Sequence, residues 1–358
     1  MQLLDLPLDI FKHIILVMVQ DNGLYKSMKT RFVCRTFANE VLDAVISTGV
    51  IEEIAKEDED LERIETHFDV IARYLHHRVR TDGPDAHPWI STIRETCALY
   101  VKHAASSEDL NPGQVEDIEF NACLCLAIHT SEVLPVLLKG AFDDKKELAG
   151  GTWENCLAIA SWIGNLSLVE SLHMDSDPVS FFGRPSWAAA AHGHLDVLQF
   201  FLRHGALLYE PTFKSRDSLG LGGSAIRAAA AMGHDKIVRL YLQPPYFSPE
   251  VQDEVGFAIH CAAETDQPQT LRTLLDQYKQ TQAEHSYLST IDCALRVSCR
   301  RGNPGAARVL LEYGADPNDT DKQPRSCLQY AVKSGDATTV KLLLDAGAYL
   351  NLLEEEWP

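Results

Sequence analysis

The chain has 358 residues, a length that allows two or three domains. Hydrophobic residues make up 46% of it and charged residues 23%, which is a globular composition rather than a disordered one. With 32 basic and 51 acidic side chains the formal net charge is −19, so binding to nucleic acid or to an anionic membrane surface is unfavourable.

Three further features of the composition bear on where the protein acts. The longest uninterrupted apolar run, Ile14 to Val19, is far shorter than the roughly 20 residues of a membrane-spanning helix. Charged residues such as Asp9 and Lys12 interrupt the apolar stretch that a signal peptide would need. The nine cysteines lack the spacing of a disulfide framework. We therefore expect a soluble protein of the cytoplasm or nucleus.

Residues 1–48 carry two apolar patterns of helical period, separated at Asn22-Gly23. The first pattern, Leu3 to Val19, has Pro7 where the first turn of a helix tolerates proline. The second pattern runs from Leu24 to Ile46. This pair predicts a small helical domain at the N-terminus.

The N-terminal motif resembles an F-box, the short three-helix motif that docks onto the Skp adaptor of cullin–RING ubiquitin ligases. The residues that carry the resemblance are Leu6-Pro7, Asp9-Ile10, Ile14-Ile15 and Arg31-Phe32-Val33-Cys34-Arg35. The resemblance implies a Skp-type adaptor and a cullin complex as partners, and an adaptor-binding face formed by Leu6, Pro7, Ile10, Ile14 and Val33.

Two departures from the F-box pattern leave an alternative open. Asp9 stands where the family usually has Glu, and no Trp closes the motif near residue 47. A short motif is also easily matched by chance. The alternative interpretation of residues 1–48 is a generic helical cap for the repeats that follow.

Residues 49–117 are predicted to form a linker of helical character. Its acidic run, Glu52 to Glu62, contains seven acids and one Lys and is typical of a solvated helix face. Thr81 to Pro88 and Ser106 to Gly113 carry the Gly and Pro residues of turns. We assign no chemistry to this stretch.

Residues 118–353 contain an internal repeat with a period near 33 residues. Each unit has a small anchor residue, Gly or Asp four positions later, an apolar residue at nine, and Leu-Leu or its equivalent at twelve and thirteen. The anchors are Ala160, Ala189, Ala229, Ala262, Ser298 and Ala331, with a weaker unit around Ala127. The pattern predicts two helices joined at the Gly, and such hairpins must stack to hide their apolar faces.

These units resemble the ankyrin repeat. The matching segments precede the anchors, as in Ser224 to Ala229 and Phe257 to Ala262. The resemblance predicts an all-α fold: an ankyrin-repeat α-solenoid over 118–353, with the three-helix F-box-like domain (1–48) and the helical linker (49–117) ahead of it.

Other chemistry in the sequence is weakly supported. Gly220 to Ala225 formally fits a dinucleotide-binding fingerprint, but the strand before it and the acid after it are missing. Cys123 and Cys125 point away from each other on a helix and lack a second ligand pair, which disfavours zinc. We therefore predict no catalytic residues, no metal and no cofactor. An enzyme with a site assembled across repeats or in the linker is the alternative.

Ankyrin repeats usually bind proteins in a concave groove, and the resemblance places certain outward positions there. The predicted partner-binding residues are Trp162, Ile163, His192, Met232, Arg300, Arg301 and Lys333. The early positions are aromatic or apolar, and the late ones are basic. We therefore expect a protein segment that is partly apolar and partly acidic or phosphorylated. The alternative is that some of these side chains, Trp162 for instance, pack against their own neighbours.

The sequence as a whole predicts a protein-interaction adaptor, the substrate receptor of a Skp–cullin–F-box ubiquitin ligase. In that arrangement the partners perform the catalysis and this chain supplies proximity. The alternative within the same class is an ankyrin scaffold or inhibitor without a ligase.

Overall fold

Helices are the regular elements in the part of the chain that the computed structural model describes. That part comprises residues 9–19, 35–47, 51, 68–104, 110–129, 137, 151–173, 177–206, 224–320 and 325–350. Within it, the β-structure is one isolated antiparallel bridge between Thr320 and Ser326. The predicted all-α class is confirmed.

The chain divides into two compact units, Met1–Cys156 and Leu157–Pro358, here called the N-terminal and C-terminal units. The division falls inside α9 (Thr152–Ile163). The predicted domain limits at 48/49 and 117/118 stay predictions.

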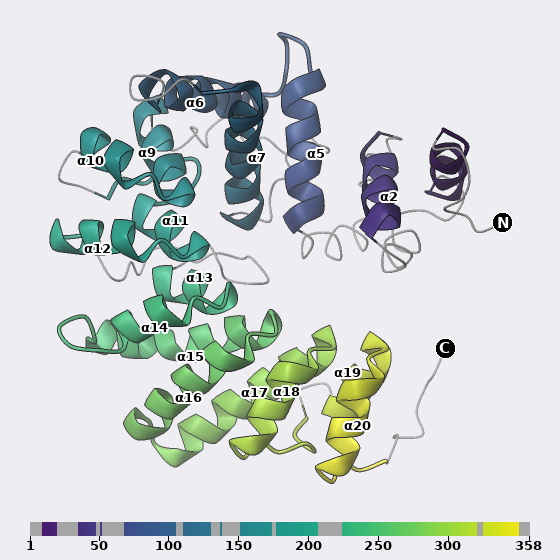
Figure 1. Cartoon of the computed structure of the whole chain (residues 1–358). Helices are drawn as coiled ribbons and strands as arrows, with labels where there is room; N and C mark the ends of the chain where they lie inside the picture. The colour runs from purple at the N-terminus through teal and green to yellow at the C-terminus, as the bar shows by residue number, and fades with distance from the viewer. Residues whose placement is uncertain are drawn as a thin grey trace. The chain divides into compact units, whose positions relative to one another are not determined.

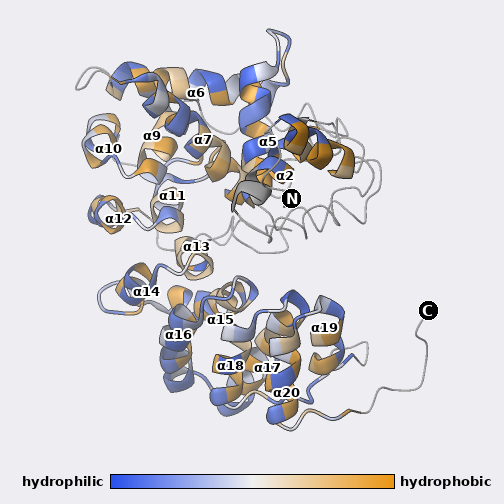
Figure 2. Cartoon of the chain, turned by 45° about the vertical axis from the view of Figure 1, so that its right-hand side comes forward, coloured by the Kyte–Doolittle hydropathy of each residue, from blue (hydrophilic) through white to orange (hydrophobic). Residues whose placement is uncertain are grey.

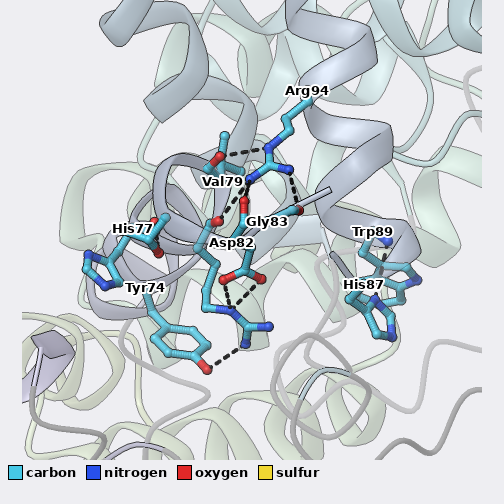
Figure 3. Close-up of polar contacts among 10 residues, drawn as sticks. Tyr74, His77, Val79, Asp82, Gly83, His87, Trp89 and Arg94 are labelled. Carbon is cyan, nitrogen blue, oxygen red and sulfur yellow. Dashed lines mark hydrogen bonds and ion pairs between the residues drawn. The ribbon is translucent and has the colours of Figure 1, made fainter. Parts of the chain in front are cut away.

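The N-terminal unit contains a helix within 9–19, then α2 (Arg35–Ser47), α5 (Phe68–Thr81), α6 (Pro88–Ala104) and α7 (Pro112–His129) (Figure 1). The α5, α6 and α7 helices pack on one another. Arg94 of α6 ties the end of α5 in place, because its guanidinium donates to the carbonyl oxygens of Val79 (2.8 Å), Asp82 (2.6 Å) and Gly83 (3.3 Å) (Figure 3). The Val79 carbonyl is one of the groups that the last turn of a helix leaves without an intrahelical partner.

The C-terminal unit is a succession of helical hairpins in chain order (Figure 1). The hairpins are α9–α10 (Leu166–Leu172), α11 (Pro185–His192)–α12 (Leu195–Arg203), α13 (Ala225–Ala231)–α14 (Asp235–Tyr241), α15 (Pro249–Glu264)–α16 (Pro268–Thr281), α17 (Glu284–Arg301)–α18 (Pro304–Glu312) and α19 (Cys327–Ser334)–α20 (Ala337–Asp345). First helices pack on first helices, as in α13–α15–α17–α19, and second helices on second helices, as in α14–α16–α18–α20. This is the predicted solenoid.

The small anchor residues explain the close approach of the first helices. The anchors from Ala160 to Ala331 are all fully buried. A larger side chain at these positions would push neighbouring helices apart, since protein interiors are close-packed. The pattern seen in the sequence is therefore a packing requirement that every hairpin repeats.

The turn inside each hairpin uses a left-handed residue, as the repeat pattern predicts. Gly193 has φ of +88° and ends α11. In every other hairpin of the unit but one, a glycine of positive φ stands at the same place. In the α15–α16 hairpin Asp266 takes this conformation with φ of +54°. Asp is one of the few side chains that tolerate it. Oδ1 of Asp266 also accepts a hydrogen bond from the amide of Ala306 in the next hairpin (2.6 Å), which offsets part of the conformational cost.

Candidate protein-binding surfaces

The N-terminal helix presents an apolar stripe to solvent. Ile10, Ile14 and Val17 are 50%, 38% and 41% exposed, and their spacing of four and three residues places them on one side of the helix. The opposite side, with Phe11, Ile15 and Val19, is buried. An exposed apolar stripe of this kind makes this side of the helix a candidate protein-interaction surface.

The other residues predicted for the adaptor-binding face cannot be placed in the same way. Leu6, Pro7 and Val33 lie outside the described residues. Ile10 and Ile14 are therefore the two predicted residues whose exposure the structure reports.

Trp162 does not lie in an exposed groove. Its side chain is fully buried, stacked on the ring of His192 (centroids 4.6 Å apart, 12° between planes) and near the ring of Trp187 (6.3 Å). The expectation that Trp162 is exposed is wrong, because the next hairpin supplies two rings that cover it. Burying such a large ring is strongly favourable, which explains why Trp187 and His192 pack against it.

His192 remains exposed while it covers Trp162. Its Nδ1 lies 2.7 Å from the carbonyl oxygen of Trp162 and 3.2 Å from Nε2 of His194. Ile163 and Met232 are half-buried. The early half of the predicted groove therefore offers an imidazole edge and part of two apolar side chains instead of an indole ring.

The late half of the predicted groove keeps two exposed cations, Arg300 and Lys333. Arg301 differs from them, since its Nε and Nη2 donate to Oε1 of Glu264 in the preceding hairpin, at 3.0 and 2.5 Å. Glu264 is nearly buried, with 6% of its side chain exposed. Arg301 is therefore part of a contact between hairpins, and Arg300 and Lys333 carry the exposed basic charge.

Phe257 is an exposed aromatic residue that the sequence pattern did not single out. Its side chain is 54% exposed, and the guanidinium carbon of Arg227 lies 4.2 Å from its ring centroid. Arg227 is fixed by two hydrogen bonds to the buried carboxylate of Glu254, at 2.5 and 2.8 Å, and Ser224 donates a third at 2.6 Å. A rigid, exposed aromatic side chain is a common anchor of protein interfaces.

A signal for Phe257 was present in the repeat alignment. It occupies the position five residues before the anchor, where the other hairpins have polar residues or Cys, such as Ser224 and Ser326. Phe257 departs from this pattern, and such a departure could have singled it out as a candidate surface residue.

The N-terminal unit also contains a polar hollow of about 470 Å³. It is lined by Val79, Arg80, Arg94, Pro112, Val115, Glu116 and Glu119. Arg80 pairs with Glu116 at 3.0 Å, and Nε2 of His76 lies 3.6 Å from Glu119. Burial lowers the pKa of His76, against the opposing effect of Glu119. The charges of Arg80 and Glu116 at this hollow are thus paired with each other.

Of the segments considered for a metal or a cofactor, the structure describes the cysteine pair but not the glycine-rich segment. Cys123 and Cys125 are both buried, and burial raises the pKa of each thiol. Among the residues that the structure describes, no group of three or more His, Cys, Asp or Glu side chains could hold a metal ion. The glycines at 220–223 lie outside the described residues. No described helix is long and apolar enough to span a membrane.

Comparison with known proteins identifies the repeat. The family model "Ankyrin repeats (3 copies)" matches residues 259–353. Over 210 residues the chain is 30% identical to an ankyrin repeat domain-containing protein of Stachybotrys chartarum, covering 57% of this chain and 10% of that protein. Over 173 residues it is 25% identical to a transient receptor potential cation channel subfamily A member 1 homolog of Caenorhabditis elegans, covering 48% and 13%. The chain thus spans only about a tenth of these relatives.

Among solved structures, the ankyrin repeat domain of human ASB11 covers 64% of this chain and 98% of its own, with 16% identity and a TM-score of 0.41. The family match and the stacked hairpins together define the described C-terminal unit as an ankyrin-repeat solenoid. Ankyrin repeats are protein–protein interaction domains, and residues 259–353 match a domain of that class.

Proposed function

We propose that the chain is a non-catalytic adaptor that joins a Skp-type protein of a cullin ubiquitin ligase to a protein substrate. Residues 1–48 act as the F-box and the ankyrin solenoid holds the substrate. The observation that carries the ligase half is the exposed stripe Ile10, Ile14 and Val17. The protein acts in the cytoplasm or nucleus, where such ligases operate.

The stripe fits an apolar groove on a partner. Its helix already buries Phe11, Ile15 and Val19 inside the N-terminal unit, so the exposed apolar face is a second surface and not the core of its own domain. Fully burying one Ile side chain contributes about 1.5–3 kcal/mol. Ile10 and Ile14 are only 50% and 38% exposed, so an interface buries about half of each side chain, and removing both costs about tenfold or more in affinity.

The substrate half of the proposal rests on exposed side chains of the solenoid. Arg300 and Lys333 are exposed cations on a chain whose net charge is −19. Phe257 is an exposed aromatic ring held by Arg227. These groups suit a segment with acidic or phosphorylated residues beside apolar ones, because Arg and Lys attract carboxylate and phosphate and an aromatic ring anchors apolar groups.

The adaptor half is tested with purified Skp adaptor and the full chain. The double variant Ile10→Asp/Ile14→Asp should lose binding, and Asp43→Lys, at an exposed residue of α2, should keep it. If the unaltered chain does not bind the adaptor, or if the double variant binds as well as Asp43→Lys does, the ligase role fails. The chain is then a scaffold or inhibitor without a ligase.

The substrate half is tested separately, with a library of acidic, phosphorylated and neutral peptides. Arg300→Glu/Lys333→Glu should abolish the preference for acidic peptides, and Arg203→Glu, an exposed basic residue on α12, should not. An unchanged preference in the double variant would reject the charge argument and leave the adaptor half standing.

A further inference from the structure

Two first helices of the C-terminal unit, α15 and α17, are longer than the first helices beside them. They have 16 and 18 residues, whereas α13 has 7 and α19 has 8. In α13 and α19 the position five residues before the anchor is the N-cap, which is Ser224 and Ser326 respectively. In α15 and α17 the same position lies inside the helix and holds Phe257 and Cys293. An N-cap favours Ser, whereas a position inside a helix accepts an aromatic residue, so the length of α15 makes Phe257 possible.

Phe257 lies in line with a column of outward residues that crosses the hairpins. Seven residues, or about two turns of helix, separate it from Glu264 on the same side of α15. Glu264 stands two residues after its anchor, and the equivalent residues of α17 and α19 are Arg300 and Lys333. Because α15, α17 and α19 pack side by side (Figure 2), these residues form one surface, here called the Phe257–Lys333 surface.

Most of the charge on the Phe257–Lys333 surface is balanced within the protein. Three arginines pair with carboxylates: Arg227 with Glu254, Arg296 with Asp319, and Arg301 with Glu264. His260, one turn after Phe257, is neutral at neutral pH, because burial and the charge of Arg296 lower its pKa. Arg300 and Lys333 are exposed and form no ion pair with another described residue. The surface therefore offers an aromatic ring at one end and positive charge at the other.

Helix geometry sets the separation of these groups. Phe257 and Arg300 differ by seven positions along the helix axis and by one hairpin across it. Seven residues of helix rise about 10 Å and neighbouring helix axes lie about 8–10 Å apart, so the two positions are about 14 Å apart. Arg300 and Lys333 occupy equivalent positions of neighbouring hairpins, about 8–10 Å apart. An extended chain advances about 3.3 Å per residue, so the two separations correspond to about four or five residues and about three.

We propose that the Phe257–Lys333 surface binds an extended segment of a partner protein that has one aromatic and two acidic residues. The first acidic residue lies about four or five positions from the aromatic one, and the second about three positions beyond it. The partner's ring packs on the face of Phe257 opposite Arg227, whose guanidinium carbon lies 4.2 Å from the ring centroid. The two carboxylates meet Arg300 and Lys333. This inference rests on the substrate half of the proposed function and adds the order and spacing of the contact groups.

Other segments fit the surface less well. A purely acidic segment would leave the Phe257 ring exposed, and a purely apolar one would leave two cations without partners. The chain's own residues Glu354 to Trp357 combine acids with an aromatic ring. Their acids lie only one to three positions from the ring, which is shorter than the separation of Phe257 from Arg300.

The spacing is tested with peptides displayed on phage and selected on the immobilised full chain. Each peptide has one Trp and two Asp residues in a Gly/Ser background, with the Asp residues about three positions apart. The Trp stands between about one and about eight positions from the nearer Asp, in either order. Enrichment should be largest at about four or five positions in one of the two orders.

The enriched peptide is then synthesised and titrated calorimetrically against variants of the full chain. Phe257→Ala should weaken binding about tenfold, because it removes the ring contact. The same variant should cost nothing further when the peptide carries Ala in place of Trp, since the two rings act as a pair. Leu288→Ala is the control, because Leu288 is 38% exposed but lies about 140° around α17 from Cys293, and it should keep affinity within about twofold.

The acidic contacts have their own matched pair of variants. Arg300→Gln should weaken binding about fivefold for the enriched peptide and leave it unchanged when the nearer Asp is replaced by Ser. Arg308→Gln, at an exposed basic residue of α18, should have no effect on either peptide. Thermal unfolding of each variant confirms that the solenoid stays folded.

The outcomes separate this inference from the proposed function. If acidic peptides are enriched whatever the position of Trp, the spacing is wrong and the substrate half of the proposed function stands. If neutral peptides are enriched as well as acidic ones, both are wrong. A dimer of the chain alone that Phe257→Ala dissociates, seen by sedimentation, identifies a second copy as the occupant. If deletion of residues 354–358 raises peptide affinity more than about tenfold, the chain's own segment occupies the surface instead of a partner.

Discussion

Replacing Arg227 with Met should strongly destabilise the C-terminal unit, because it leaves a buried carboxylate without its counter-ion. Glu254 has 3% of its surface exposed. It accepts two hydrogen bonds from Arg227, at 2.5 and 2.8 Å, and one from Ser224 at 2.6 Å. These contacts join α13 to the long α15 helix, and Arg227→Met removes the two that carry positive charge while it keeps most of the side-chain volume.

The magnitude follows from the burial of the pair. Breaking a buried ion pair by removing one partner costs about 3–5 kcal/mol, whereas replacing both partners with apolar residues is close to neutral. Arg227 keeps 16% of its side chain exposed and Ser224 still donates to Glu254, so we expect the lower end, about 3 kcal/mol. Arg227→Met/Glu254→Leu should recover all but about 1 kcal/mol of this loss.

Urea unfolding followed by circular dichroism measures these free energies, and hydrogen exchange of the α13 and α15 amides locates the change. The control is Arg239→Met, because Arg239 forms a more exposed ion pair with Asp235 within α14 and should cost under about 1 kcal/mol. If Arg227→Met and Arg239→Met are equally mild, or if the double variant is less stable than Arg227→Met alone, the buried pair is not the contact that holds α13 to α15.

Three further outcomes follow from particular groups. Burial lowers the pKa values of His194 and His234, so the unfolded chain binds more protons below pH 6.5 and stability should fall on acidification, by at most about 1.4 kcal/mol per pH unit for each histidine. His194→Gln/His234→Gln should flatten this pH dependence in urea unfolding. Gly193→Ala should lower the free energy of unfolding more than Gly205→Ala does. Both glycines have positive φ, but only at Gly193 would a Cβ meet a ring, that of His234. The difference between the two unfolding free energies isolates that clash. Burial raises the pKa of the Cys97 thiol to about 12, so a thiol reagent at pH 8 should modify Cys97 only after unfolding.

The repeat architecture could be predicted from the sequence because its signals are local. An anchor such as Ala262 must be small wherever two first helices touch, and a turn such as the one at Gly193 needs left-handed backbone. Both requirements recur in every hairpin, so a period near 33 residues exposes them. Even the Asp266 exception fits the pattern, since the repeat allows Gly or Asp at that position.

The candidate site was harder to predict because exposure depends on residues about thirty positions away. Trp162 is at an outward position of its own hairpin, yet Trp187 and His192 of the next hairpin bury it. The sequence shows that Arg301 is basic, but it does not show that the guanidinium donates its hydrogen bonds to Glu264 of the preceding hairpin. A periodic pattern reports the face of a helix on which a residue lies, and it does not report which neighbour covers that face.

The exposed basic charge at Arg300 and Lys333 also depends on a contact between neighbouring hairpins. The position two residues after the anchor holds Glu264, Arg300 and Lys333 in successive hairpins. Glu264 alone among these would repel an acidic partner, but Arg301 reaches back to it and offsets its charge within the protein. Under the proposed function, an acidic segment would meet Arg300 and Lys333 without an opposing carboxylate from this column. Its acidic part would then lie at α17 and α19, and its apolar part nearer Phe257.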